Sequence, residues 1–321
     1  MIGEDILKYS FVIPCYNSAH TIGKVVDEIK EKMQELNETS YEIILVDDYS
    51  PDRTTKDVIF ELANQENIRA IALAKNAGQE NALMAGYRAS SGDYVVSLDD
   101  DGQHPVNQLD RLINKLNEGY DVVIAHYANK KHSSFRNLGS KLNDKMEIDL
   151  LGKPKDLYIG SFFIAKRFVI DKIIEYPNPY TYIRGLLLTA TSNIANVEVD
   201  HRERLEGNSQ YTLKKLIHLW SNGFTSFSVK PLRFATLVGS LVALFGFLFA
   251  IYVIINKIIH PEIQAGWSSL MAMMTFLIGI TLCTLGMIGE YIGRIFISLN
   301  RSPQYVISET KNMNRDNKTQ S

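Results

Sequence analysis

The stretch Tyr94-Val-Val-Ser-Leu-Asp-Asp-Asp-Gly-Gln-His-Pro105 runs from a short apolar segment directly into three adjacent carboxylates. Carboxylates this close repel one another unless a cation lies among them. Asp101 and Gln103 are two positions apart, so their side chains point the same way in an extended segment. Such oxygen ligands suit Mg²⁺ or Mn²⁺ rather than zinc. Taken alone, an Asp triplet is more typical of a solvated acidic turn, and the motifs elsewhere in the chain turn the prediction to a divalent metal site.

The apolar half of this stretch is one of several strand-like runs between residues 9 and 125. These runs are Tyr9–Pro14, Tyr41–Val46, Ile68–Leu73, Tyr94–Leu98 and Asp121–Ala125, and they alternate with helix-like stretches at about 20–36, 53–66, 78–90 and 105–118. The alternation predicts an α/β domain with a mainly parallel sheet and helices on both faces. Ligands of such sheets bind beyond the carboxyl ends of the strands. Polar motifs follow the first four strands, so we expect the functional site at that edge.

Two common ligand classes are disfavoured. The first strand is not followed by Gly-x-Gly-x-x-Gly, and the chain has no Gly-rich loop ending in Gly-Lys-Ser/Thr, which argues against dinucleotide and P-loop sites. The formal net charge is -2, and the part of the chain before residue 234 has no basic stripe, which argues against a nucleic-acid-binding function.

The chain has two cysteines, Cys15 and Cys283, which we expect in a strand and in a membrane span. We expect no disulfide between them in a reducing compartment.

Two uncharged apolar runs, Phe234 to Ile255 and Trp267 to Ile288, are each long enough to cross a bilayer as a helix. The alternative is a pair of buried core helices. The connector from 256 to 266 carries few charges, whereas the outer flanks carry Lys214, Lys215, Lys230, Arg233, Arg294 and Arg301. The positive-inside bias therefore predicts that both flanks, and the first 230 residues, lie in the cytoplasm.

The segments beside these runs are amphipathic or polar. Leu213, Leu216, Ile217 and Trp220 recur at helical spacing with lysines between them, which predicts an interfacial helix at lipid head groups; the alternative is a core-facing helix. Further upstream, Arg136 and Ser140 are spaced i, i+4 and would share one face of a helix. The tail from 298 to 321 is polar and predicted to be largely disordered, apart from a stub around Pro303 to Ile307.

Taken in order, the motifs resemble those of the family-2 inverting glycosyltransferases, which have the Rossmann-like GT-A fold. Within that family the chain looks like the polyprenyl-phosphate glycosyltransferases, the group of dolichyl-phosphate mannose synthase and its bacterial relatives with two C-terminal membrane spans. The likeness runs from about residue 9 to residue 307. It is carried by Val12-Ile-Pro-Cys-Tyr-Asn17, Val46-Asp-Asp-Tyr-Ser-Pro-Asp52, Lys75-Asn-Ala-Gly78, Gln79-Glu-Asn-Ala-Leu-Met-Ala-Gly86, Asp99-Asp-Asp-Gly-Gln-His-Pro105, the segment His201 to Tyr211, Ser226-Phe-Ser-Val-Lys-Pro-Leu-Arg233 and Gly289-Glu-Tyr-Ile-Gly-Arg294.

The resemblance implies roles for particular residues. A nucleotide pocket would be lined by Pro14, Tyr16, Asn17, Asp47, Asp48, Lys75, Asn76 and Gly78, with Asp47 or Asp48 accepting a base N–H. A metal would be held by Asp99, Asp101 and Gln103. Phosphates of the lipid or the donor would be met by Arg136, Ser140, Arg202, Arg204 and Ser209. The catalytic set would be Asp99, Asp100, Asp101, Arg136 and Arg204. The chain departs from the family at Gln210, where Lys is frequent, and at Phe163, where many members have Arg.

The implied reaction is inverting attack by a polyprenyl phosphate, such as undecaprenyl phosphate, on a UDP- or GDP-linked sugar. The product would be a lipid-phosphate sugar donor for modifying cell-envelope glycans. A divalent cation would neutralise the leaving diphosphate. A phosphate acceptor is already anionic, so it needs arginines to bring the two anions together rather than a base. Asp99 and Asp100 are candidate bases if the acceptor is instead a sugar hydroxyl.

The predicted organisation follows. It consists of a cytoplasmic GT-A domain at 1–210, juxtamembrane helices at 211–233, a hairpin at 234–297 with spans at about 234–256 and 267–290, and the tail. The protein would be a multi-pass protein of the bacterial inner membrane, with a nucleotide sugar, a polyprenyl phosphate and the bilayer as partners; a homo-oligomer is left open. The alternatives are a membrane glycosyltransferase acting directly on a glycan hydroxyl and a catalytically inactive membrane scaffold.

Overall fold

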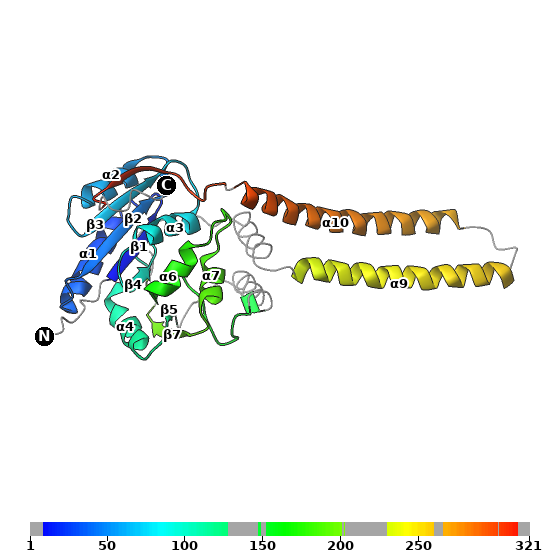
Figure 1. Cartoon of the computed structure of the whole chain (residues 1–321), viewed down its shortest axis with the longest axis horizontal. Helices are drawn as coiled ribbons and strands as arrows, with labels where there is room; N and C mark the ends of the chain where they lie inside the picture. The colour runs from blue at the N-terminus through cyan, green and yellow to red at the C-terminus, as the bar shows by residue number, and fades with distance from the viewer. Residues whose placement is uncertain are drawn as a thin grey trace. The chain divides into compact units, whose positions relative to one another are not determined.

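The structure is a computed structural model that describes residues 9–127, 147–148, 152–200, 202, 230–259, 266–300 and 302–313. The chain divides into two compact units (Figure 1). One unit comprises Met1–His218 together with Arg301–Ser321, and the other is Leu219–Asn300. The first unit is therefore built from two segments that are separated in sequence by the whole of the second.

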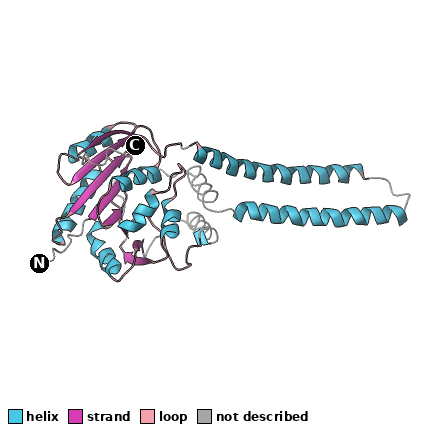
Figure 2. Ribbon diagram, in the orientation of Figure 1, coloured by secondary structure: helices cyan, strands magenta, loops and turns pink. Residues whose placement is uncertain are grey.

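An eight-stranded sheet forms the centre of the first unit, and its strands have the order β7-β5-β6-β4-β1-β2-β3-β8. Figure 2 shows strands in magenta and helices in cyan. The pairs β1–β2, β1–β4, β2–β3 and β5–β7 are parallel, whereas β6 is antiparallel to β4 and β5. This mainly parallel sheet confirms the predicted fold class. The strands are β1 Tyr9–Cys15, β2 Tyr41–Asp47, β3 Ile68–Leu73, β4 Tyr94–Ser97, β5 Val122–Tyr127, β6 Phe163–Lys166, β7 Ile194–Val199 and β8 Ile307–Lys311.

The four helices expected between the first five strands are present, and two short helices follow later in the chain. They are α1 Ile22–Glu35, α2 Thr54–Leu62, α3 Gln79–Ala89, α4 Leu109–Asn117 after the 3₁₀ turn Val106–Gln108, α6 Arg167–Ile174 and α7 Ile183–Ala190. In α4 the buried side chains Leu109, Leu112 and Leu116 recur at helical spacing, which gives the helix one apolar face toward the sheet.

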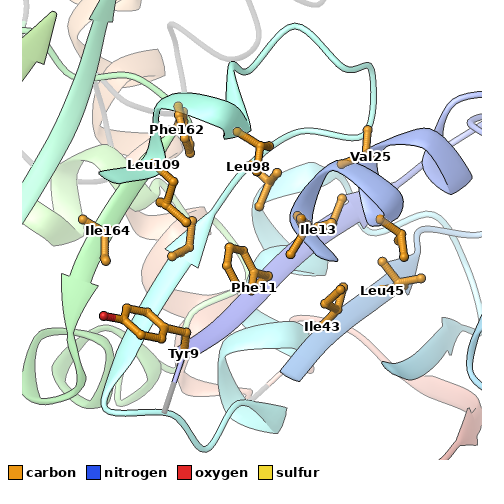
Figure 3. Close-up of a cluster of buried hydrophobic side chains, with 14 of the residues drawn as sticks. Tyr9, Phe11, Ile13, Val25, Ile43, Leu45, Leu98, Leu109, Phe162 and Ile164 are labelled. Carbon is orange, nitrogen blue, oxygen red and sulfur yellow. The ribbon is translucent and has the colours of Figure 1, made fainter. Parts of the chain in front are cut away.

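The core lies on both faces of β1. Phe11 and Ile13 pack with Ile43 and Leu45 of β2 and with Val25 of α1 on one face (Figure 3). Val12 points the other way, toward α3, where a Cβ added at Gly86 would overlap its side chain. Helix α3 therefore approaches the sheet so closely that only glycine fits at that contact.

The tail differs from the prediction of disorder. Strand β8 pairs antiparallel with β3, and Ala70 lies opposite Lys311 in the register. Lys311 Nζ donates to the carbonyl oxygen of Phe60 at 2.8 Å, and Asn312 Nδ2 donates to the carbonyl oxygen of Ile68 at 2.8 Å. An edge strand held by its backbone and by polar side chains needs no alternating apolar pattern, which is why the polar sequence concealed it. The prediction excepted a stub around Pro303 to Ile307, and it is wrong for residues 308–313, which continue in strand β8 and its flank.

The second unit contains two long helices, α9 Lys230–Ile259 and α10 Trp267–Leu299, which run side by side as an antiparallel pair (Figure 1). Among the described residues, one stretch, Phe276–Ile297, is long and apolar enough to cross a membrane, and none of it is buried inside the structure. Ala235–Phe249 is a shorter apolar stretch. Crossing by both helices therefore stays a prediction. The predicted interfacial helix lies outside the described residues.

Candidate active site

The motifs after β1, β2, β3 and β4 meet at the carboxyl ends of these strands. The backbone N–H of Asp48, just beyond β2, donates to the carbonyl oxygen of Cys15 at 2.9 Å. The N–H of Asn17, just beyond β1, donates to Ser50 Oγ at 3.1 Å. Asn17 has a φ of 54° and Tyr49 a φ of 58°, so both loops turn sharply there. These contacts join the first two motifs into one surface.

Asp48 is buried and bound to the loop that follows β3. Its Oδ1 accepts the N–H of Ala77 at 2.7 Å and its Oδ2 accepts the N–H of Gly78 at 2.9 Å. Asn76 Nδ2 donates to the backbone oxygen of Asp48 at 3.0 Å. Burial raises the pKa of Asp48 to about 6 against the opposing effect of these hydrogen bonds. The predicted nucleotide residues Asp48, Asn76 and Gly78 are therefore brought together.

The other predicted nucleotide residues surround this contact. Asp47 is buried, and its Oδ1 accepts the hydroxyl of Ser50 at 2.5 Å; burial raises the pKa of Asp47. Pro14 lies within β1, and Lys75 is exposed in the loop after β3. Tyr16 is 37% exposed, so its ring is open to solvent beside these loops.

Asp99, the first residue of the acidic triplet, is held by three side chains. Its Oδ1 accepts Gln79 Nε2 at 2.7 Å, and its Oδ2 accepts Ser161 Oγ at 2.7 Å and lies 2.9 Å from His104 Nε2. Burial alone would raise its pKa, but the charge and hydrogen bond of His104, the hydrogen bond of Ser161 and the charge of Arg184 hold the pKa of Asp99 below its ordinary value. Asp99 is therefore fixed in orientation.

His104 is itself buried in an aromatic setting. Its Nδ1 forms a hydrogen bond with the hydroxyl of Tyr127, and its ring lies 5.1 Å from that of Phe162. The sequence analysis assigned no role to His104 or Ser161. His104 could have been found from its place in the Gln-His-Pro motif, whereas Ser161 is 62 positions from Asp99 and gives no local signal.

The other two aspartates have different surroundings. Asp100 Oδ2 accepts the N–H of Tyr16 at 3.0 Å, and burial, with its neighbouring carboxylates, raises the pKa of Asp100 to about 6. Asp101 Oδ1 accepts the N–H of Gln103 at 3.0 Å, and Gly102 between them has a φ of 71°. The segment is therefore a turn rather than the extended stretch from which the shared side-chain direction was predicted, and it brings the Asp101 carboxylate to the backbone of Gln103.

The metal assignment can be tested against this donor set. Among the described residues no group of three His, Cys, Asp or Glu side chains could hold a metal. Both Asp99 oxygens accept hydrogen bonds from neighbouring side chains. Asp101 and Gln103 supply hard oxygen donors that fit Mg²⁺ or Mn²⁺. Such an ion leaves several of its coordination positions to the oxygens of a substrate. The residues therefore fit a cation that completes its shell with phosphate oxygens.

The first turn of α3 connects this cluster to later parts of the chain. Gln79 reaches Asp99, and Glu80 Oε2 accepts the N–H of Ile183, the first residue of α7, at 2.7 Å. Arg184 follows in α7, and its Nη1 lies 3.6 Å from Glu147 Oε1 with 38% of its side chain exposed. The sequence analysis did not single out Gln79, Glu80 or Arg184.

Several predicted phosphate residues, Arg136, Ser140, Arg204 and Ser209, lie outside the described residues, as does Gln210. Arg202 is described. Its Nη1 donates to Glu28 Oε2 and its Nη2 to Asn107 Oδ1, both at 2.7 Å. Phe163 lies in β6 and is 1% exposed, between Ser97 and Ile124 in the register. Phenylalanine at this position is thus a core residue.

Comparisons with known proteins agree with this geometry. The chain is 36% identical to an undecaprenyl-phosphate 4-deoxy-4-formamido-L-arabinose transferase from Proteus mirabilis (strain HI4320), over 99% of this chain and 98% of that protein. It is 33% identical to a protein of the same name from Photorhabdus laumondii subsp. laumondii, over the same shares. A crystal structure of glucosyl-3-phosphoglycerate synthase from Mycobacterium tuberculosis, in complex with Mn²⁺, UDP and phosphoglyceric acid, matches with a TM-score of 0.51 and 22% identity, over 67% of this chain and 75% of that chain.

Two family models match the two units. The model of glycosyl transferase family 2 matches residues 10–174, which hold the sheet and the acidic triplet. The model of the GtrB C-terminal hairpin matches residues 230–295, which hold α9 and α10. The chain is therefore a glycosyltransferase of family 2 with a GT-A-like fold and a GtrB-type C-terminal hairpin.

Proposed function

We propose that this enzyme transfers a sugar from a nucleoside diphosphate sugar to undecaprenyl phosphate, with inversion at the anomeric carbon. The observation that carries the proposal is the match, over nearly the full length of both chains, to relatives named as undecaprenyl-phosphate sugar transferases. The acidic triplet at the carboxyl ends of the strands supports it, because donor sites of parallel sheets lie there. A formamido-deoxy pentose, the sugar in the relatives' names, is the first donor to test.

The proposed donor site uses the loops after β1 to β4. The exposed Tyr16 side chain would offer a stacking face for the nucleobase, and the loop that Asp48 holds at Ala77 and Gly78 would line the same site. Asp101 and Gln103 would hold Mg²⁺ or Mn²⁺ against the diphosphate. When bound, that ion supplies charge neutralisation for the leaving diphosphate.

In this proposal the chain's own residues orient the two anions. The three donors on Asp99 fix the acidic turn, so no reorganisation of the turn is needed at the moment of reaction. Arg184 is a partly exposed cation whose charge acts on Asp99. We assign it, with Arg136 and Arg204, to phosphate binding. Because a phosphate monoester is already anionic near neutral pH, no side chain must remove a proton from it.

A direct assay tests this proposal. Purified protein in detergent is incubated with undecaprenyl phosphate, Mg²⁺ and a panel of UDP- and GDP-linked sugars, and the lipid product is identified by mass spectrometry. We expect one donor class to give a lipid-phosphate sugar and a stoichiometric amount of nucleoside diphosphate. Release of nucleoside diphosphate without a sugar-bearing lipid, across the whole panel, would contradict the proposal.

A second acceptor class, a glycan hydroxyl, would need a general base. Asp100, which follows β4 and has a pKa raised to about 6 by burial, is the candidate for that role. The two readings differ in the product, because sugar on a lipid phosphate is released by mild acid whereas an ordinary glycosidic bond survives it. Acid-stable transfer to added glycan, with undecaprenyl phosphate left unused, would establish the second reading.

A further inference from the structure

Gln304 lies in the segment that follows α10 and belongs to the first unit. Its side chain is buried, and Nε2 donates to the carbonyl oxygens of Asn178 at 2.7 Å and Tyr176 at 2.9 Å and lies 3.3 Å from Thr181 Oγ1. All three partners belong to the loop between α6 and α7. One amide group therefore fixes both ends of this loop.

The loop passes these contacts on to α3. Thr181 Oγ1 donates to Asn81 Oδ1 at 2.7 Å, and Asn81 Nδ2 donates to the carbonyl oxygens of Pro179 at 3.1 Å and Ala77 at 2.9 Å. Ala77 in turn donates its N–H to Asp48. A continuous chain of hydrogen bonds thus runs from Gln304 to the buried carboxylate of the donor site.

The same turn of α3 carries the other site contacts. Gln79 holds Asp99, and Glu80 accepts the N–H of Ile183 at the start of α7. Arg88 of α3 makes a second link, since it donates to the hydroxyl of Tyr305 at 3.0 Å and to the carbonyl oxygens of Ile174, the last residue of α6, at 3.1 Å and of Tyr176 in the loop at 3.4 Å. Gln304 therefore contacts the loop directly, and Tyr305 is linked to it through Arg88.

We propose that Gln304 is a positioning residue for the donor site: it holds the α6–α7 loop, and through Thr181 and Asn81 it fixes the first turn of α3. This role depends on the proposed function only where it is tested by catalytic activity. Without the amide donor, the part-buried carbonyl oxygens of Tyr176 and Asn178 each lose a hydrogen bond. The network is then less fully satisfied, which costs more in a partly buried setting than in water. The loop and the turn then move together.

Gln304→Glu tests the proposal, because it keeps the shape of the side chain and replaces the amide, which donates to two carbonyl oxygens, with a carboxyl group that can donate at most one hydrogen bond. Thr181→Val removes the next hydrogen bond of the same chain, from Thr181 to Asn81, and is measured in parallel. Lys311→Met is the matched control: it removes two hydrogen bonds from the same segment, to the Phe60 carbonyl oxygen and to Asn64, and touches no part of the loop.

Three measurements separate positioning from simple stability. We expect Gln304→Glu and Thr181→Val to speed amide hydrogen exchange at 77–81 and 176–183 and to weaken binding of the nucleoside diphosphate about tenfold. The kcat/KM for the nucleotide sugar should fall at least as far, with the KM for the lipid little changed. Lys311→Met should lower the melting temperature and leave all three readouts at wild-type values.

The outcomes are distinct. Unchanged exchange at 77–81 in both Gln304→Glu and Thr181→Val, or the same changes in Lys311→Met, would overturn the proposal. If the wild-type enzyme transfers no sugar to undecaprenyl phosphate, the proposed function fails, while exchange and nucleotide binding still decide the role of Gln304. If Gln304→Glu does not fold, Thr181→Val carries the same test.

Discussion

Asp99, Asp100 and Asp101 are consecutive in the chain but meet different partners. Asp99 accepts hydrogen bonds from Gln79 and Ser161 and pairs with His104, Asp100 accepts the N–H of Tyr16, and Asp101 closes a turn with Gln103. The spacing in the sequence predicted that Asp101 and Gln103 would share a direction. Gln79 and Ser161 come from elsewhere in the fold, whereas His104 belongs to the same motif as Asp99. Together they show Asp99 to be the anchored member of the triplet.

Asp101→Ala should remove the carboxylate that we assign to the metal. We expect turnover to fall at least about a hundredfold, about 3 kcal/mol in the barrier, because the leaving diphosphate is no longer neutralised. Chelation should silence the native enzyme, and added Mg²⁺ or Mn²⁺ should restore it. Asp171→Ala, at an exposed carboxylate of α6, is the control and should keep full activity. Full activity in excess EDTA would exclude the metal.

Arg184→Gln should weaken phosphate binding. Loss of the guanidinium should raise the KM for the substrate whose phosphate Arg184 contacts. Kinetics measured with varied nucleotide sugar and, separately, with varied undecaprenyl phosphate show which substrate that is. Arg184→Lys should restore only part of the effect, since a point charge replaces a planar fork. Arg111→Gln, at an exposed arginine that donates to the carbonyl oxygen of Glu198, is the control. Unchanged KM values in both arms would leave Arg184 as the partner of Glu147 alone.

Asp100 predicts a particular pH dependence of stability. Its pKa is raised to about 6, so between about pH 4 and 6 the folded state binds more protons than the unfolded state. Stability should therefore fall as pH rises through that window and then level off. In the presence of chelator, the fall in melting temperature from pH 5 to pH 7.5 should be smaller in Asp100→Asn than in the wild type. Equal falls in the two proteins would contradict the raised pKa.

The helices and strands whose hydrophobic residues recur with a clear period could be predicted from the sequence, and the later ones could not. Strands β1 to β5 and helices α1 to α4 follow from alternating apolar and amphipathic segments. The short elements β6, α6, α7 and β7 and the polar edge strand β8 carry no such signal. Ser161, Arg184 and Gln304 lie in or beside these elements, so the sequence could predict the acidic turn but not these later side chains around the site.

The close packing of α3 on β1 can be tested at Gly86. A Cβ there would overlap Val12, so Gly86→Ala should destabilise the protein by about 1–3 kcal/mol despite the better helix propensity of alanine. Gly23→Ala in α1 is the matched control, because nothing lies within 4 Å of its added Cβ, and it should stabilise by up to about 1 kcal/mol. Thermal unfolding measures both. An equal rise in stability for the two variants would show that the sheet yields.

For the whole molecule, the sheet itself constrains topology. Residues before 219 and residues after 300 belong to one unit, so they must lie on the same side of any membrane that α9 and α10 cross. In a background without Cys15 and Cys283, Ser302→Cys should resist an impermeant thiol reagent in intact cells, and Gln264→Cys in the connector should react. Reaction at position 302 but not at 264 would reverse the predicted orientation.

The pairing of β8 with β3 also sets an order of events during synthesis. Ser308 Oγ donates to the carbonyl oxygen of Ala72, 236 positions earlier in the chain. The outer edge of β3 therefore stays unpaired during synthesis until both hydrophobic helices have been made. An open strand edge is a template for aggregation. A ribosome that stalls between Ile68 and Ile307 would thus leave an aggregation-prone nascent domain. Truncation ahead of the hairpin would likewise yield a domain that lacks its final strand.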